Sequence, residues 1–262
     1  MLLAFPEVFF VILPELAPMR GFDTRRPQNH CWDVWGHTAH AVAAIALESV
    51  LRLTMLFHDS GKPETFRYDA QAGFGRFPGH PAVSARIADA ALRRLRCDNA
   101  ARERVLTLVE NHEMRTGHGK KDLRRLLAKI GEENMRDLLL VRRADAAAHA
   151  PEAAARLTAL ADEDERILHE ITAERGCLHV KDLAVSGNDL LALGLKPGAA
   201  VGETLSRLLD LVLDEEVPNE KGALLAAARK EMQTHEGSED PMARPLVLLH
   251  GVSGILHRDR PL

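Results

Sequence analysis

Apolar residues recur along most of the chain at the three- and four-residue spacing of amphipathic helices. From His37 to about Val50 they surround the helix almost completely, which predicts a buried helix, and a second apolar run follows over 51–57. The Gly-rich, aromatic segment 64–80 breaks this spacing and predicts a loop or short β-hairpin. Short helices packed at angles are predicted over 177–202, and longer helices at 81–96, 99–113, 120–130, 132–149, 151–175, 203–216 and 219–231.

The composition favours an all-α protein. Aromatic residues make up 4% of the 262 residues, and the helix-favouring residues Ala, Leu, Arg and Glu dominate. Hydrophobic residues at 46% and charged residues at 27% are typical of a soluble globular chain of one or two domains. This balance excludes wholesale disorder, a collagen-like chain and a coiled coil.

Two features bear on the cellular compartment. The apolar stretch 8–13 lies between Pro6 and Pro14, and no basic segment precedes it, so it predicts neither a signal peptide nor a membrane span. The three cysteines form no C-x-x-C pair, which suits a reducing environment. We therefore expect a cytoplasmic protein without a membrane partner.

Charge is unevenly distributed, although the net charge is only -4. Residues 86–143 carry 15 Lys and Arg against 9 Asp and Glu, whereas residues 144–220 carry 6 against 16. An anionic partner such as RNA would meet the first stretch. Both stretches could equally be solvated helix faces. The basic residues expected to contact phosphates are Arg93, Arg94, Arg96, Lys120, Lys121, Arg124 and Arg125.

Histidine and aspartate provide the strongest chemical signal. His37 precedes the contiguous pair His58-Asp59 by 21 residues, and Asp145 follows Asp59 by 86 residues. Each falls on a predicted helix or at a helix end, where its ligand atoms would be held rigidly. Imidazole and carboxylate together suit a divalent metal such as Mn, Fe, Co, Ni or Zn. A single buried histidine needs no metal, but burying four such residues is costly unless partners or a metal compensate.

Three more residues fit the same site. His80 follows the Gly-rich segment and His112 ends a predicted helix, so that, with Asp59 bridging, they complete a second metal site or contact a substrate instead. Lys62 follows Asp59 by three residues, where its ammonium could approach a phosphate oxygen. A lysine at a helix C-terminus is equally common for purely structural reasons.

In the order H…HD…H…H…D, these residues resemble the HD superfamily of metal-dependent phosphohydrolases. The likeness extends to the region that follows the catalytic head of bacterial tRNA nucleotidyltransferases, the CCA-adding enzymes. The matching segments are colinear over roughly residues 10–230. They are LPELAPMRGFD at 13–23, DVWGHT at 33–38, LFHDSGKPETF at 56–66, GHPAVSARIA at 79–88, LVENH at 108–112, RRADAAAHAP at 142–151, VSGNDLLALGLKPGAAVG at 185–202 and PNEKGALL at 218–225.

The resemblance implies an all-helical HD bundle followed by a smaller C-terminal helical region, which supports tRNA in the full enzymes. The domains would be a lead-in at 1–27, the metal-binding domain at 28–150, the C-terminal region at 151–231 and a tail at 232–262. Carried over by position, the metal ligands would be His37, His58, Asp59 and Asp145, with Mg also admitted as the ion. Asp59 and Lys62 would be catalytic, and His80 and His112 would line the site.

The family's nucleotidyltransferase head has no counterpart in the sequence, because only some 30 residues precede the HD region. We therefore do not expect this chain to add CCA by itself, and a separate head would be its partner. Some family members hydrolyse 2′,3′-cyclic phosphates and phosphomonoesters. The expected function is accordingly a metal-dependent phosphohydrolase acting on small phosphoesters, nucleotides or RNA ends. The alternatives are an RNA-binding region of a truncated or split tRNA nucleotidyltransferase, possessing no activity of its own, and an inactive metal-stabilised remnant.

Overall fold

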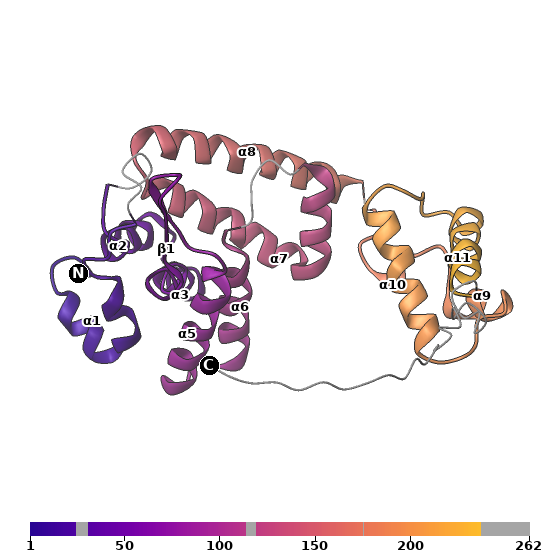
Figure 1. The fold of residues 1–262 in the computed structure, drawn as a ribbon, viewed down its shortest axis with the longest axis horizontal. Helices are drawn as coiled ribbons and strands as arrows, with labels where there is room; N and C mark the ends of the chain where they lie inside the picture. The colour runs from indigo at the N-terminus through magenta and orange to yellow at the C-terminus, as the bar shows by residue number, and fades with distance from the viewer. Residues whose placement is uncertain (25–30, 114–118, 175, 237–262) are drawn as a thin grey trace, which may run out of the picture. The chain divides into compact units, whose positions relative to one another are not determined.

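The computed structural model describes residues 1–24, 31–113, 119–174 and 176–236. Within these ranges all regular elements are helices except for the two strands of one sheet, which confirms the predicted all-α fold (Figure 1). The elements are α1 (Pro6–Ile12), η1 (Pro14–Met19), α2 (Val34–Ala44), α3 (Ser49–Phe57), α4 (Lys62–Thr65), β1 (Arg67–Asp69), β2 (Phe74–Arg76), α5 (His80–Arg94), α6 (Asn99–Asn111), α7 (Lys120–Ala147), α8 (Pro151–Ala173), η2 (Val180–Asp182), α9 (Gly187–Ala192), α10 (Ala199–Leu213) and α11 (Lys221–Glu236), where η marks a 3₁₀ helix.

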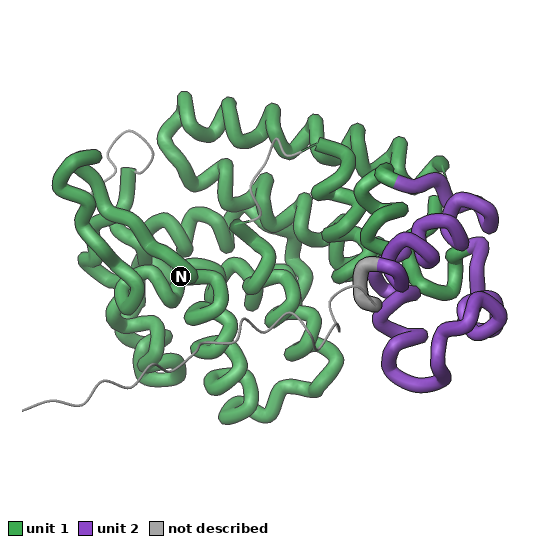
Figure 2. Tube along the Cα trace, turned by 45° about the vertical axis from the view of Figure 1, so that its right-hand side comes forward, with its two compact units in different colours: residues 1–183, 209–216 green, residues 184–208, 217–262 purple. Residues whose placement is uncertain are grey.

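The chain forms two compact units (Figure 2). Unit 1 comprises residues 1–183 and 209–216, and unit 2 comprises 184–208 together with the residues from 217 onward. The domain boundaries expected from the family resemblance remain predictions. None of the described helices is both long and apolar enough to cross a membrane.

The prediction of one buried helix over residues 37–50 is wrong about where the helix ends. α2 ends at Ala44, and the backbone of Ile45 is extended, with ψ of 157°. α3 begins at Ser49, where the side chain of Glu48 accepts a hydrogen bond of 2.8 Å from the backbone N–H of Leu51. This capping bond starts a new helix where hydrophobicity alone predicts a continuous one. The interruption allows α3 to pack beside α2, so that His37 and His58 meet.

Two helix ends follow the sequence signals closely. Gly131 has φ of +80° within α7, a conformation that glycine adopts readily, and it separates the two helical segments predicted at 120–130 and 132–149. Pro151 occupies the first turn of α8, where its missing N–H costs nothing. α8 packs along α7, and a buried ion pair of 2.5 Å between Arg142 and Asp164 joins the two helices (Figure 1).

The predicted hairpin is present. β1 and β2 pair in antiparallel register, with Arg67 opposite Arg76 and Asp69 opposite Phe74. Gly75 allows the strand to approach Phe66 closely, because a Cβ there would lie 2.4 Å from the Phe66 ring.

The core of unit 1 lies among α2, α3, α5, α6 and α7. Its fully buried side chains include Phe57, Leu92, Leu108, Met135 and Leu138. Burial of such side chains stabilises the fold by about 1.5–3 kcal/mol each, before the cost of ordering the chain. The ends of these helices carry the polar residues of the candidate site.

Unit 2 contains α9, α11 and the first part of α10. Ser186 and Asp189 form a capping box at the start of α9, and Lys221 pairs with Asp189 at 2.6 Å. α11 continues to Glu236, beyond the helix end predicted at 231. The remainder of the predicted tail, from 237 to 262, lies outside the described residues.

Candidate metal centre

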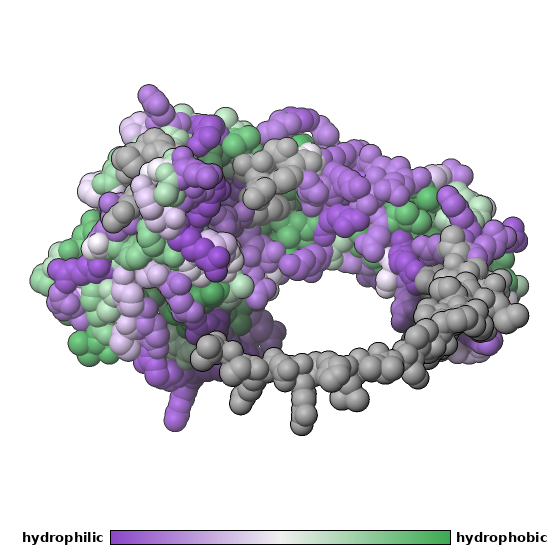
Figure 3. Space-filling model, viewed as in Figure 1, coloured by the Kyte–Doolittle hydropathy of each residue, from purple (hydrophilic) through white to green (hydrophobic). Residues whose placement is uncertain are grey.

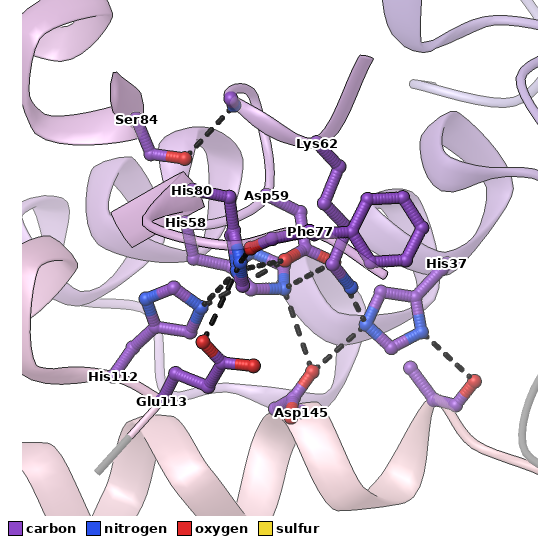
Figure 4. Close-up of polar contacts among 12 residues, drawn as sticks. His37, His58, Asp59, Lys62, Phe77, His80, Ser84, His112, Glu113 and Asp145 are labelled. Carbon is purple, nitrogen blue, oxygen red and sulfur yellow. Dashed lines mark hydrogen bonds and ion pairs between the residues drawn. The ribbon is translucent and has the colours of Figure 1, made fainter. Parts of the chain in front are cut away.

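The predicted ligands of unit 1 converge from separate elements (Figure 4). His37 lies on α2, His58 and Asp59 directly follow α3, and Asp145 lies in the last turn of α7. All of these residues except the half-buried Asp145 are buried. Sequence reasoning therefore identified residues that the fold brings together, although their role as ligands stays a prediction.

The first group of ligand atoms surrounds the Nε2 atoms of His37 and His58. Nε2 of His37 lies 2.8 Å from Asp145 Oδ1 and 3.7 Å from Asp59 Oδ2. Nε2 of His58 lies 3.3 Å from Asp59 Oδ2 and 3.4 Å from Asp145 Oδ1. Ligand atoms of His37, His58 and Asp59 thus lie close enough together for one metal ion, and Asp145 Oδ1 lies within 3.4 Å of both Nε2 atoms.

Backbone carbonyls orient the histidine rings. A carbonyl oxygen can only accept, so each Nδ1 that contacts one must carry its proton, which leaves Nε2 to face the centre. The Nδ1 atoms of four histidines make such contacts: His37 to Ala148 O at 3.2 Å, His58 to Met55 O at 2.6 Å, His80 to Phe77 O at 3.2 Å and His112 to Val109 O at 2.7 Å.

The donor set fits a cation. Nε2 of His58 is buried and makes no hydrogen bond with any described residue, although two carboxylates lie close to it. Burial alone would lower the pKa of His58, but the charges of Asp59 and Asp145 raise that pKa to about 10. The centre therefore attracts a positive charge, which either a proton or a metal ion can supply.

A second group lies on the other side of Asp59. Oδ1 of Asp59 lies 3.3 Å from Nε2 of His80 and 3.7 Å from Nε2 of His112. The Nε2 atoms of His80 and His112 are 3.2 Å apart. Because each ring carries its proton on Nδ1, the lone pairs of the two Nε2 atoms face one another unless a proton or cation lies between them. Burial lowers the pKa of His112, which favours the neutral form that binds metals. Asp59 thus lies where it can bridge two ligand groups.

Lys62 contacts the bridging carboxylate. Its Nζ donates a hydrogen bond of 2.6 Å to Asp59 Oδ2 and lies 5.6 Å from the centre of the Phe77 ring. Burial would raise the pKa of Asp59, but the charges of His58 and Lys62 hold it well below its usual value. The sequence-based role for Lys62, contact with a phosphate, stays a prediction.

Gly61 explains how the His58-Asp59 segment reaches α5. A Cβ at this position would lie 2.6 Å from His80 O and 2.8 Å from Ser84 N, so only glycine fits. Its backbone N–H donates a hydrogen bond of 2.9 Å to Ser84 Oγ. The glycine therefore brings Asp59 close to His80.

Sequence reasoning missed His149. This half-buried histidine forms a third possible ligand group with His37 and Asp145, and its ring packs edge-on against that of His37. Its Nδ1 lies 2.8 Å from the carbonyl oxygen of Asp145. The available signal was its position four residues after Asp145, on the same face of the helix predicted at 132–149, although α7 in the structure ends at Ala147.

Most of the basic residues expected to contact RNA form ion pairs with carboxylates. Arg93 pairs with Asp89, and Arg94 pairs with Glu15. The four basic residues of the 120–125 segment all pair with acidic residues of unit 1: Lys120 and Arg124 with Glu174, Arg124 with Glu215, and Lys121 and Arg125 with Asp214. Arg96, which is exposed, makes no ion pair within the described residues. The basic surface is therefore less positive than the sequence predicts.

Most of the chain is similar to known tRNA nucleotidyltransferases. Residues 82–228 match the family described as tRNA nucleotidyltransferase domain 2. A CC-adding tRNA nucleotidyltransferase of Thermus thermophilus is 35% identical over 208 residues, which cover 76% of this chain and 45% of the relative. An A-adding tRNA nucleotidyltransferase of Deinococcus radiodurans is 31% identical over 211 residues, which cover 76% of this chain and 46% of the relative. The chain thus spans about half the length of these curated relatives.

These names correct one expectation. The chain was expected to be a phosphohydrolase, but both curated relatives are named as enzymes that add nucleotides. The physical reason for the error is that a cluster of imidazoles and carboxylates binds metal whatever reaction its protein serves, so the ligand set alone does not select hydrolysis. The likeness to the HD superfamily itself stays a prediction.

Proposed function

Because the chain belongs to the tRNA nucleotidyltransferase family, we propose that it is the tRNA-binding region of such an enzyme and has no catalytic activity of its own. The region would hold tRNA while a nucleotidyltransferase part, separate from the described helices, adds nucleotides. An RNA-binding region of this kind was the alternative to a phosphohydrolase in the sequence analysis.

The family match over residues 82–228 carries the proposal. It begins near the start of α5 and ends within α11, so it contains the whole basic stretch and parts of both compact units. Both relatives, each of which matches 76% of this chain, have tRNA in their names. The shared region is thus a reasonable source of the tRNA contacts.

Surface ion pairs do not prevent such contacts. The side chain of Arg93 is 65% exposed and that of Lys121 is 48% exposed. Ion pairs at such positions contribute only about 0–1 kcal/mol, so an RNA phosphate can replace the carboxylate partner. We assign the phosphate contacts to Arg93 and Arg94 at the end of α5, to Arg96 just beyond it, and to Lys120, Lys121 and Arg125. Arg124, which was also expected to contact phosphate, is buried and is left out of this assignment.

The metal centre has a structural role in this proposal. His37, His58, Asp59 and Asp145 would hold one divalent ion, and Asp59 with His80 and His112 would hold a second. The fit of the donor atoms, including the unpaired Nε2 of His58, supports this assignment. When bound, the metal would link α2, α3 and α7 and so stabilise the unit that carries the basic residues. Mn, Fe, Co, Ni, Zn and Mg remain the candidates.

The test is the salt dependence of tRNA binding. Fluorescence anisotropy would measure the affinity of the full chain for a labelled tRNA without its 3′ CCA, over a series of NaCl concentrations. An unstructured RNA of equal length serves as the specificity control. We expect tighter binding to tRNA and a linear fall of log K with log salt. Affinity that is indifferent to salt, or equal for both RNAs, would contradict the proposal.

Matched variants locate the contacts. The double variant Arg93→Ala, Arg96→Ala should reduce the steepness of the salt dependence by about two, because each phosphate contact contributes about 0.9. The control is Arg156→Ala, Arg166→Ala, which removes the same charge from exposed positions of α8, in the acidic stretch. The control variant should retain the slope of the unaltered chain. Equal losses in both variants would show that only net charge matters.

A further inference from the structure

His149 lies beside the metal centre but is not part of the motif that identified it. The motif H…HD…H…H…D ends at Asp145, and His149 follows four residues later. The His149 ring packs edge-on against the ring of His37, with 4.9 Å between the ring centres. His37, Asp145 and His149 each offer a ligand atom, and these three atoms lie within 4.8 Å of one another. The proposed function gives His149 no role.

The turn between α7 and α8, residues 148–150, orients both histidine rings. The carbonyl oxygen of Ala148 accepts a hydrogen bond of 3.2 Å from Nδ1 of His37. The carbonyl oxygen of Asp145 accepts a hydrogen bond of 2.8 Å from Nδ1 of His149. Because a carbonyl oxygen can only accept, each ring keeps its proton on Nδ1, and Nε2 is the nitrogen that remains to bind a metal.

The residues of the centre differ in their exposure to solvent. The side chains of His58 and Asp59 are 1% and 2% exposed, whereas that of Asp145 is 29% exposed and His149 is half-buried. Asp145 Oδ1 lies 2.8 Å from Nε2 of His37 and 3.4 Å from Nε2 of His58. A cation bound to this oxygen would therefore meet His37 and His58 on its buried side, and His149 lies towards the exposed side.

Two clefts in the described part of the chain are not lined by the ligand residues. An apolar groove of about 780 Å³ lies between the N-terminal segment and helices α2 and α3, and a cleft of about 200 Å³ lies between α7 and α8. Figure 3 shows apolar residues gathered around α1, which borders the larger groove. Neither cleft therefore provides space for a substrate beside the metal.

We propose that His149 is a further metal ligand, which closes the exposed side of the ion held at His37 and Asp145. Structural metal sites are closed by protein ligands, whereas catalytic sites keep one position for water or substrate. With His149 the ion has three imidazole ligands, a composition that favours Fe, Co, Ni or Zn over Mg and Mn. This inference rests on the proposed function, because it deepens the structural role that the metal has there.

The experiment uses Co²⁺ as the probe, because its visible absorption depends on the number and kind of its ligands. Co²⁺ is titrated into the metal-free full chain, into His149→Ala and into His149→Phe, which keeps a ring against His37 but has no nitrogen. His40→Ala is the matched control, because His40 is half-buried on α2 and belongs to none of the three ligand groups. Circular dichroism establishes that each metal-free protein is folded.

Both variants of His149 should bind Co²⁺ at least about tenfold more weakly than the unaltered chain, since losing a partner that only orients a ligand already costs about 10–100-fold. Their absorption spectra should also change, whereas His40→Ala should match the unaltered chain. Azide, a small anion that binds cobalt at an open position, should alter the spectrum of His149→Ala but not that of the unaltered chain. The affinity ratio of Zn to Mg, measured by calorimetry, should fall in both variants of His149.

Three outcomes would overturn this assignment of His149. They are an unaltered chain that binds no Co²⁺, a His149→Phe chain with the affinity and spectrum of the unaltered chain, and an unaltered chain whose spectrum changes with azide. Binding of tRNA by the metal-loaded unaltered chain is measured in parallel by fluorescence anisotropy. If tRNA binds but His149 does not affect Co²⁺, only the ligand is rejected. If tRNA does not bind, the proposed function is rejected and the result for His149 stands.

Discussion

Replacing Gly61 by alanine should destabilise unit 1 and disturb the metal centre. The added Cβ would lie 2.6 Å from His80 O and 2.8 Å from Ser84 N, both of which are backbone atoms that no rotamer change can remove. Restoring ordinary contact requires a retreat of roughly 0.8 Å by α5 or by the His58-Asp59 segment. Overpacking of this kind costs about 1–3 kcal/mol, and losing the bond from Gly61 N to Ser84 Oγ adds about 1 kcal/mol.

The expected loss is thus about 2–4 kcal/mol in the free energy of unfolding. Urea titration followed by circular dichroism measures this loss, with each transition assigned separately because the chain has two compact units. Calorimetric titration with Mn should also show weaker binding, because His80 lies on the displaced side of the contact.

The control is the same substitution at Gly202 on α10. No atom lies within 4 Å of a Cβ added there. Alanine should therefore stabilise that helix by about 0.5–1 kcal/mol, because it has the higher helix propensity. A Gly61→Ala chain whose stability lies within about 0.5 kcal/mol of the unaltered chain would refute the packing argument.

Three further predictions concern the centre and the helix packing. A divalent metal that binds at the centre, added at 100 times its dissociation constant, should stabilise unit 1 by about 2.7 kcal/mol. The stabilisation is measured as a rise in Tm that a chelator reverses. A Tm that no candidate metal changes would contradict the assignment of the ligands. Asp59→Asn, which keeps the shape of the bridging side chain but removes its charge, should abolish most of that rise, and an unchanged rise would show that the metal binds elsewhere. Asp164→Ala should lower the free energy of unfolding by about 3–5 kcal/mol, because it leaves the buried Arg142 unpaired. Glu163→Ala, at an exposed neighbouring position, should change the free energy of unfolding by less than about 1 kcal/mol. Similar urea midpoints for the two variants would refute the stabilising role of the ion pair between Arg142 and Asp164.

Most helix boundaries were predictable because their signals are local. Proline at 151 and glycine at 131 act on the backbone of their own turn, so reading the sequence locates the start of α8 and the break in α7. The break between α2 and α3 was missed because apolar residues surround most of the segment 37–57, despite Glu48 and Ser49. There the deciding interaction is the single capping bond from Leu51 N–H to Glu48.

The sequence predicted most of the residues that form the candidate site, but not how their side chains are placed relative to one another. Residue type and order identified His37, the pair His58-Asp59 and Asp145, since imidazoles and carboxylates are seldom placed in apolar helices without partners. No spacing rule shows that the two oxygens of Asp59 face different histidine pairs. The participation of His149 likewise depends on where α7 packs against α2.

The sequence by itself determined that the chain is helical, where most helices end and which residues could bind a metal, because propensity, capping and ligand chemistry belong to individual residues and their near neighbours. Tertiary structure alone decided which charges are free. Arg125 is paired by Asp214, 89 residues away in sequence, whereas Arg52 has a buried Nε without a partner. Coulomb interactions and desolvation depend on distance and burial in the folded chain, and position along the sequence specifies neither.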